Sequence, residues 1–135
     1  MIYLDAAAIV KLCHSEPGTD ELVDWLRDRS ERALVSSALA EIEVPRALRR
    51  SAPHALPAVP AVLNRLFRVD IDSTVRATAA AYDDHRMRSL DAIHLATASV
   101  LARTGDQELT FVTYDRRLLD AAARVGFDCT APGLG

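Results

Sequence analysis

The chain has 135 residues, of which 50% are hydrophobic and 26% are charged, and its formal net charge is −3. This length and composition suit one globular domain with its own core, so we expect a single domain over residues 1–135. The net charge excludes a global basic field that would attract nucleic acid. No apolar run approaches the roughly 20 residues of a membrane span and no secretory leader precedes the first strand, so we expect a cytoplasmic protein.

Strands and helices alternate from the start of the chain. A short apolar strand covers residues 2–4 and ends at Asp5. The pattern then predicts helices over 6–13 and 19–29, a strand over 33–35, and a helix that Ser36 or Ser37 caps and that runs to about residue 50. Pro45 lies inside this last helical pattern, which indicates a kink or a late helix start.

The second half continues the alternation. It predicts a turn and a helix through residue 66, a strand over 67–71, a helix capped by Ser73 or Thr74, a helix from Ser89 that Gly105 ends, a strand over 109–113, a helix over 118–125 and a short strand over 127–129. Residues 131–135 look like a loose tail. Such alternation predicts a three-layer α/β/α domain around a central, mainly parallel sheet of four to five strands.

Four acidic residues lie beside strand ends or helix starts: Asp5, Glu43, Asp91 and Asp115. In an open α/β fold these positions converge on the carboxyl edge of the sheet, where ligands bind. Carboxylates gathered in one pocket repel each other unless a cation lies among them, and an all-oxygen ligand set suits Mg²⁺ or Mn²⁺. Such a site favours hydrolysis of phosphodiester bonds.

Four segments resemble those of PIN-domain ribonucleases, and specifically VapC-type toxins of toxin–antitoxin pairs. They are residues 2–12, 35–47, 89–98 and 111–118, in the order of that family. The resemblance implies a metal-dependent endoribonuclease that cuts structured RNA (transfer, ribosomal or messenger) and inhibits growth unless a small VapB-like antitoxin binds it. It also implies a homodimer and a toxin–antitoxin hetero-oligomer.

The resemblance assigns the catalytic and metal-binding positions to Asp5, Glu43, Asp91 and Asp115, with Thr113 as a supporting hydroxyl. Glu41 competes with Glu43 for the second position, because two residues that are two apart on a helix point in different directions. The spacing from Ser37 and the following Val44-x-Arg46-Ala47 fit the family pattern better with Glu43.

Two kinds of side chain near these acids are further candidates. Arg46 and Arg50 share the helix side of Glu43 and Arg116 follows Asp115, so these arginines are possible contacts for RNA phosphates, although solvated arginines are the ordinary outcome. His94 lies three residues after Asp91 on one helix face. We expect it to be packed or hydrogen-bonded rather than catalytic.

Other functional classes fit less well. A receiver-like phosphoacceptor module shares the size and the acidic pocket, but it needs a lysine near the last strands and Lys11 is the only lysine. A haloacid-type phosphatase needs an aspartate two residues after the first, where this chain has Ala7. A PIN domain that binds RNA without cutting it remains an alternative, against which the complete acidic set argues.

Overall fold

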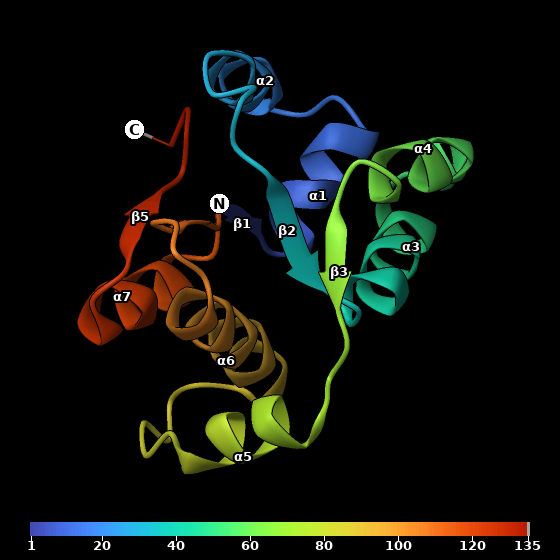
Figure 1. Ribbon diagram of the computed structural model, residues 1–135. Coiled ribbons are helices and arrows are strands. Elements are labelled where there is room, and N and C mark those ends of the chain that lie inside the picture. The colour runs from blue at the N-terminus through green and yellow to red at the C-terminus, as the bar shows by residue number, and fades with distance from the viewer. Residues whose placement is uncertain (135) are drawn as a thin grey trace.

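A five-stranded sheet lies between two layers of helices in the computed structural model, which describes residues 1–134 (Figure 1). The strands are β1 (Ile2–Leu4), β2 (Leu34–Ser37), β3 (Phe67–Val69), β4 (Thr110–Val112) and β5 (Asp128–Thr130). They are all parallel and lie in the order β3-β2-β1-β4-β5. The predicted α/β/α architecture with its parallel central sheet is therefore confirmed.

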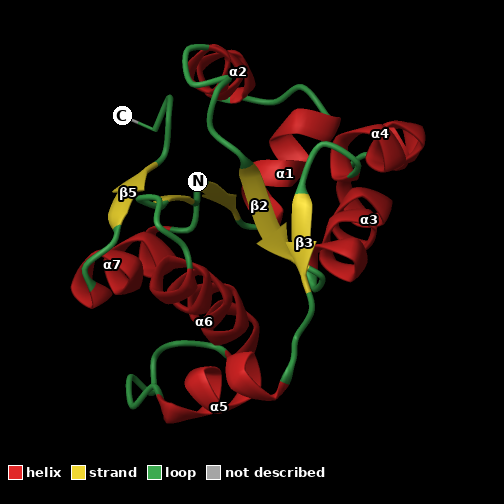
Figure 2. Ribbon diagram, in the orientation of Figure 1, coloured by secondary structure: helices red, strands yellow, loops and turns green. Residues whose placement is uncertain are grey.

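Helices cover both faces of the sheet (Figure 2). One layer contains α1 (Ala6–Cys13), α2 (Thr19–Arg27), α3 (Ala40–Ser51), the 3₁₀ helix η1 (Pro53–Ala58) and α4 (Val59–Leu63). The other layer contains α5 (Ser73–Ala81), α6 (Ser89–Thr104) and α7 (Arg116–Val125). Among these helices of residues 1–134, none combines the length and hydropathy that a membrane crossing requires.

Alternating side chains of the central strand β1 fill the two cores. Ile2 and Leu4 pack into the cluster with α1 to α4, whereas Tyr3 points to the opposite face and packs with α6 and α7. The Tyr3 ring stacks on Phe111 of β4 at a centroid distance of 5.0 Å. Because both faces of this strand are buried, its residues read as a continuous apolar run rather than as an alternating one.

The strand order places a topological switch point between β1 and β4. The chain proceeds from β1 to β2 and β3 on one side and then returns to add β4 and β5 on the other side of β1. Asp5 follows β1 and Thr113 follows β4, so both lie at this point on the carboxyl edge. Open parallel sheets bind their ligands at such a crevice.

The second strand is longer than predicted, because Ser36 and Ser37 belong to β2 and not to a helix cap. Ser36 is buried and its hydroxyl donates to the carbonyl oxygen of Leu4 at 2.6 Å. The Ser37 hydroxyl accepts from the Leu39 amide at 3.1 Å and so closes the turn into α3. These partners satisfy polar groups that burial would otherwise leave unpaired.

Several helix boundaries also differ from the prediction. Helix α3 starts at Ala40 and continues through Pro45, so the late start is wrong. Asp72, rather than Ser73 or Thr74, caps α5 by accepting from the Val75 amide at 2.9 Å. The remaining differences are of one or two residues: α7 begins at Arg116, β3 ends at Val69, and β5 covers Asp128–Thr130.

Gly126 ends α7 in the left-handed conformation, with φ of 104° and open space where a side chain would stand. We expect Gly126→Ala to lower the free energy of unfolding by about 1–2 kcal/mol, since an L-residue is strained at this φ. Gly126→Asn should lose less, because asparagine adopts this conformation more readily. Urea unfolding of both variants measures this, and equal stability of Gly126→Ala and the wild type would contradict it.

Candidate active site

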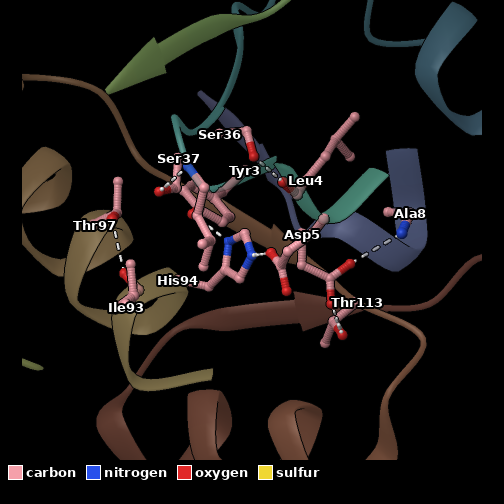
Figure 3. Close-up of polar contacts among 12 residues, drawn as sticks. Tyr3, Leu4, Asp5, Ala8, Ser36, Ser37, Ile93, His94, Thr97 and Thr113 are labelled. Atoms are coloured by element: carbon pink, nitrogen blue, oxygen red, sulfur yellow. Dashed lines mark hydrogen bonds and ion pairs between the residues drawn. The ribbon is translucent and has the colours of Figure 1, made fainter. Parts of the chain in front are cut away.

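Asp5 is the most deeply buried acid of the carboxyl edge, with 4% of its surface exposed. Its Oδ1 accepts from the Ala8 amide at 3.0 Å and thereby caps α1, while its Oδ2 accepts from the Thr113 hydroxyl at 2.5 Å (Figure 3). Burial raises the pKa of Asp5, and these hydrogen bonds only partly oppose the rise. The side chain is therefore fixed in place although burial disfavours its charged form.

The Thr113 hydroxyl joins two of the acids. While it donates to Asp5, it accepts from the backbone amide of Asp115 at 3.1 Å. The Asp115 carboxylate caps α7, where Oδ1 accepts from the amide of Arg117 at 2.9 Å. One buried hydroxyl thus sets the position of Asp5 relative to the loop that carries Asp115.

Asp91 lies in the first turn of α6 and is partly exposed. Burial raises the pKa of its carboxyl group, and the neighbouring charge of Asp115 raises it further. The two acids are therefore close enough to repel each other, as expected for carboxylates that converge on one edge.

Glu43 reaches the same edge from α3, in the opposite helix layer. Its Oε1 lies 2.6 Å from Nε2 of His94 on α6. Glu41 instead lies 3.6 Å from the guanidinium of Arg68 on β3. The two glutamates therefore point to different neighbours, and Glu43 is the one that lies beside the other acids.

A groove of about 600 Å³ brings the predicted acids together. Its lining includes Asp5, Glu43, Asp91 and Asp115, together with His94 and the α3 arginines Arg46, Arg49 and Arg50. As these side chains lie, no three His, Cys, Asp or Glu residues within 1–134 are gathered tightly enough to hold a metal ion. The four acids share one groove, in which Oε1 of Glu43 lies against His94 and Asp115 caps the start of α7.

The predicted arginine contacts divide into two groups. Arg46 and Arg50 line the groove with Glu43, and Arg49 joins them. Arg116 is exposed and does not line it. Arg117 instead lies with Arg124 and Asp91 at a smaller cleft of about 110 Å³.

His94 is packed and hydrogen-bonded, as the sequence predicted, with only 2% of its surface exposed. Its Nδ1 lies 2.7 Å from the hydroxyl of Tyr3 (Figure 3). Its Nε2 lies 2.6 Å from Oε1 of Glu43. Sequence reasoning missed that these partners form a chain into the acidic groove. The available signal was the spacing of three residues from Asp91, which places both side chains on one face of α6.

The model of the PIN domain family matches residues 2–124 of the chain. Ribonuclease VapC35 of Mycobacterium tuberculosis is 50% identical over 133 residues, which cover 98% of each chain. Ribonuclease VapC46 of the same organism is 44% identical over 131 residues, with 97% of each chain covered. The chain therefore belongs to the PIN-domain family and, within it, to the VapC ribonucleases.

A solved structure has the same fold at low sequence identity. It is the crystal structure of VapBC2 from Rickettsia felis bound to a DNA fragment from their promoter. The alignment has a TM-score of 0.71 and 15% identity, and it covers 98% of this chain and 99% of that one. The family that the sequence resembles is thus confirmed by sequence relatives, and its fold by a structure.

The raised pKa of Asp5 gives this residue a measurable effect on stability. A carboxyl group whose pKa is higher in the folded chain than in the unfolded one binds its proton more tightly when folded. The free energy of unfolding therefore falls as the pH rises from the unfolded pKa, near 3.8, through the folded pKa. Replacing the Asp5 carboxyl group with a neutral side chain should abolish this fall in the free energy of unfolding with rising pH.

We expect Asp5→Asn, measured in EDTA, to be more stable than the wild type at neutral pH. The difference should disappear at a pH below 3.8, where the wild-type carboxyl group is protonated in both states. Urea unfolding across this pH range measures both parts. A variant that is less stable than the wild type at every pH would show that the lost hydrogen bonds outweigh the desolvated charge.

Proposed function

We propose that this chain is the toxin of a toxin–antitoxin pair and acts as a Mg²⁺- or Mn²⁺-dependent endoribonuclease. One observation carries the proposal: carboxylates from four separate elements line a single groove at the switch point of a parallel sheet. The ribonuclease relatives, similar over nearly their full length, support the reaction class. Family membership also excludes the receiver-like alternative, and receiver sheets have the strand order 2-1-3-4-5 rather than the order found here.

The donor set of the groove fits a hard divalent cation. Asp5, Glu43, Asp91 and Asp115 offer only oxygen ligands, and beside the effect of burial the charge of Asp115 raises the pKa of Asp91. A cation among them would remove this repulsion. When bound, it supplies a Lewis acid for the phosphodiester and an activated water for attack.

The protein itself contributes position and charge to this chemistry. Thr113 holds Asp5 and the loop of Asp115 in one arrangement, and the start of α6 presents Asp91 to the groove. The small side chains of Ala6 and Ala7 also line the groove and keep its wall low beside Asp5. A phosphodiester backbone can thus approach the carboxylates without displacing a bulky side chain.

The arginines of α3 supply positive charge to the groove, beside its acids. Arg46 and Arg50 lie with Glu43 along its wall, and arginine binds phosphate through two parallel hydrogen bonds. We place the RNA strand over these side chains, with the scissile phosphate at the carboxylates. Structured RNA is the substrate class, and the cytoplasm is the expected compartment.

The antitoxin is the proposed partner that keeps this groove inactive. The solved structure of similar fold contains VapB and VapC together, which supports such an assembly. The exposed apolar side chains Ile42 and Leu90 line the groove beside the acids and suit a protein segment better than RNA. A homodimer of this chain remains an expectation from the family resemblance.

Glu43→Gln and Glu41→Gln form a matched pair that tests the site. Glu43→Gln should lower the rate of RNA cleavage at least about 100-fold, because the lost stabilisation is worth several kcal/mol and each 1.4 kcal/mol is a factor of ten. Glu41→Gln loses only its contact with Arg68 and should cleave like the wild type. Single-turnover cleavage of total RNA in Mn²⁺, with 5′-end mapping and an EDTA control, provides the measurement.

Slow cleavage by Glu41→Gln, together with wild-type cleavage by Glu43→Gln, would instead assign the site to Glu41. Cleavage that survives EDTA in the wild type would overturn the metal requirement. A wild-type chain that binds RNA but does not cut it in Mn²⁺ would favour the scaffold alternative over the enzyme.

Arg50→Gln tests the proposed RNA path. The variant should bind RNA more weakly, and the slope of log affinity against log salt should become shallower by about 0.7, the value for one contact to a single-stranded phosphate. Arg27→Gln is the control, because Arg27 is an exposed arginine of α2 that pairs with Asp24. Fluorescence anisotropy at several salt concentrations measures both slopes, and equal slopes would remove Arg50 from the path.

A further inference from the structure

A buried chain of hydrogen bonds leads from the core of the sheet to the acidic groove. It begins at the hydroxyl of Tyr3, in the middle of β1, which lies 2.7 Å from Nδ1 of His94. It continues from Nε2 of His94 to Oε1 of Glu43 at 2.6 Å. Tyr3 and His94 are almost fully buried, whereas the Glu43 side chain is 23% exposed.

The chemistry of the three groups fixes the direction of the chain. An ionised carboxylate only accepts hydrogen bonds, so Nε2 of His94 carries the proton and donates a hydrogen bond to Glu43. In the neutral ring Nδ1 is then an acceptor, and the Tyr3 hydroxyl donates to it. Tyr3 thereby selects the tautomer of His94 that Glu43 requires.

Glu43 needs such a partner more than Asp5 and Asp115 do. Asp5 and Asp115 are short side chains that are held by backbone amides at helix starts. Glu43 lies within α3 rather than at a helix cap, has one more rotatable bond, and its described hydrogen bond is the one with His94. Holding Oε1 leaves Oε2 as the oxygen available to a cation.

We propose that Tyr3 and His94 are positioning residues that hold Glu43 in the orientation required for binding the divalent cation. The inference rests on the proposed function, because it requires a cation among the carboxylates. Outer partners of this kind raise metal affinity by restricting the ligand before the metal arrives. Neither residue touches the substrate in this arrangement.

Calorimetric titration of the full-length chain with MnCl₂, without RNA, tests the proposal. His94→Leu should weaken Mn²⁺ affinity about 10- to 100-fold, and Tyr3→Phe about 3- to 10-fold, as for losses of outer-shell partners. His94→Gln should retain more affinity than His94→Leu, because its amide can still donate to Glu43. The phenylalanine in Tyr3→Phe keeps the stacking on Phe111. If His94→Leu does not fold, Tyr3→Phe alone still tests the proposal.

Tyr82→Phe is the matched control. Tyr82 packs against the same core cluster as Tyr3, and among residues 1–134 its hydroxyl bonds only to Ser99, at 3.1 Å, away from the groove. We expect this variant to lose thermal stability without losing Mn²⁺ affinity. A packing role alone would give Tyr3→Phe the same result as the control.

Three outcomes are distinguishable. Weaker Mn²⁺ binding by Tyr3→Phe, with unchanged binding by Tyr82→Phe, supports the positioning role. Wild-type affinity in Tyr3→Phe and His94→Leu, while Glu43→Gln binds weakly, overturns this inference and leaves the proposed function intact. Absence of Mn²⁺ binding by the wild type overturns the metal requirement itself and the inference with it.

Discussion

The hydrogen bond between Thr113 and Asp5 is the constraint around which the site is built. It joins the residues that follow β1 and β4, the two neighbouring strands between which the chain reverses its direction of sheet growth. Asp5 is buried there at a cost in stability, because burial disfavours its charge. The same hydroxyl accepts from the amide of Asp115, so the acids that follow two adjacent strands are held by one side chain. A buried acid with a shifted pKa is typical of functional sites.

The groove exists because two helix layers meet above this edge. Glu43 comes from α3 on one face of the sheet, while Asp91 and His94 come from α6 on the other. The hydrogen bond between Glu43 and His94 crosses the edge and ties the layers together. One helix, α3, therefore supplies both an acid of the site and the arginines that suit a phosphate backbone.

The alternation of strands and helices and the convergence of the four acids on one edge could be predicted, since both depend on local patterns and on the parallel topology. The extension of β2 to Ser37 could not, because it depends on pairing with Arg68 and Val69 of β3, which lie far along the chain. The turn of Glu43 toward His94 and of Glu41 toward Arg68 likewise depends on partners from distant elements. Helix geometry alone separates the two glutamates without saying which one faces the acids.

The order in which the elements follow one another along the chain has a consequence for synthesis. Asp5 and Glu43 belong to the first third, but Asp91, Thr113 and Asp115 belong to the last. The strand that precedes Thr113 pairs directly with the first strand, so the centre of the sheet joins segments that are synthesised far apart in time. A nascent chain that has not yet reached Asp91 lacks half of the acids and the hydroxyl that holds the first of them, so the groove cannot assemble before both parts of the chain have been made.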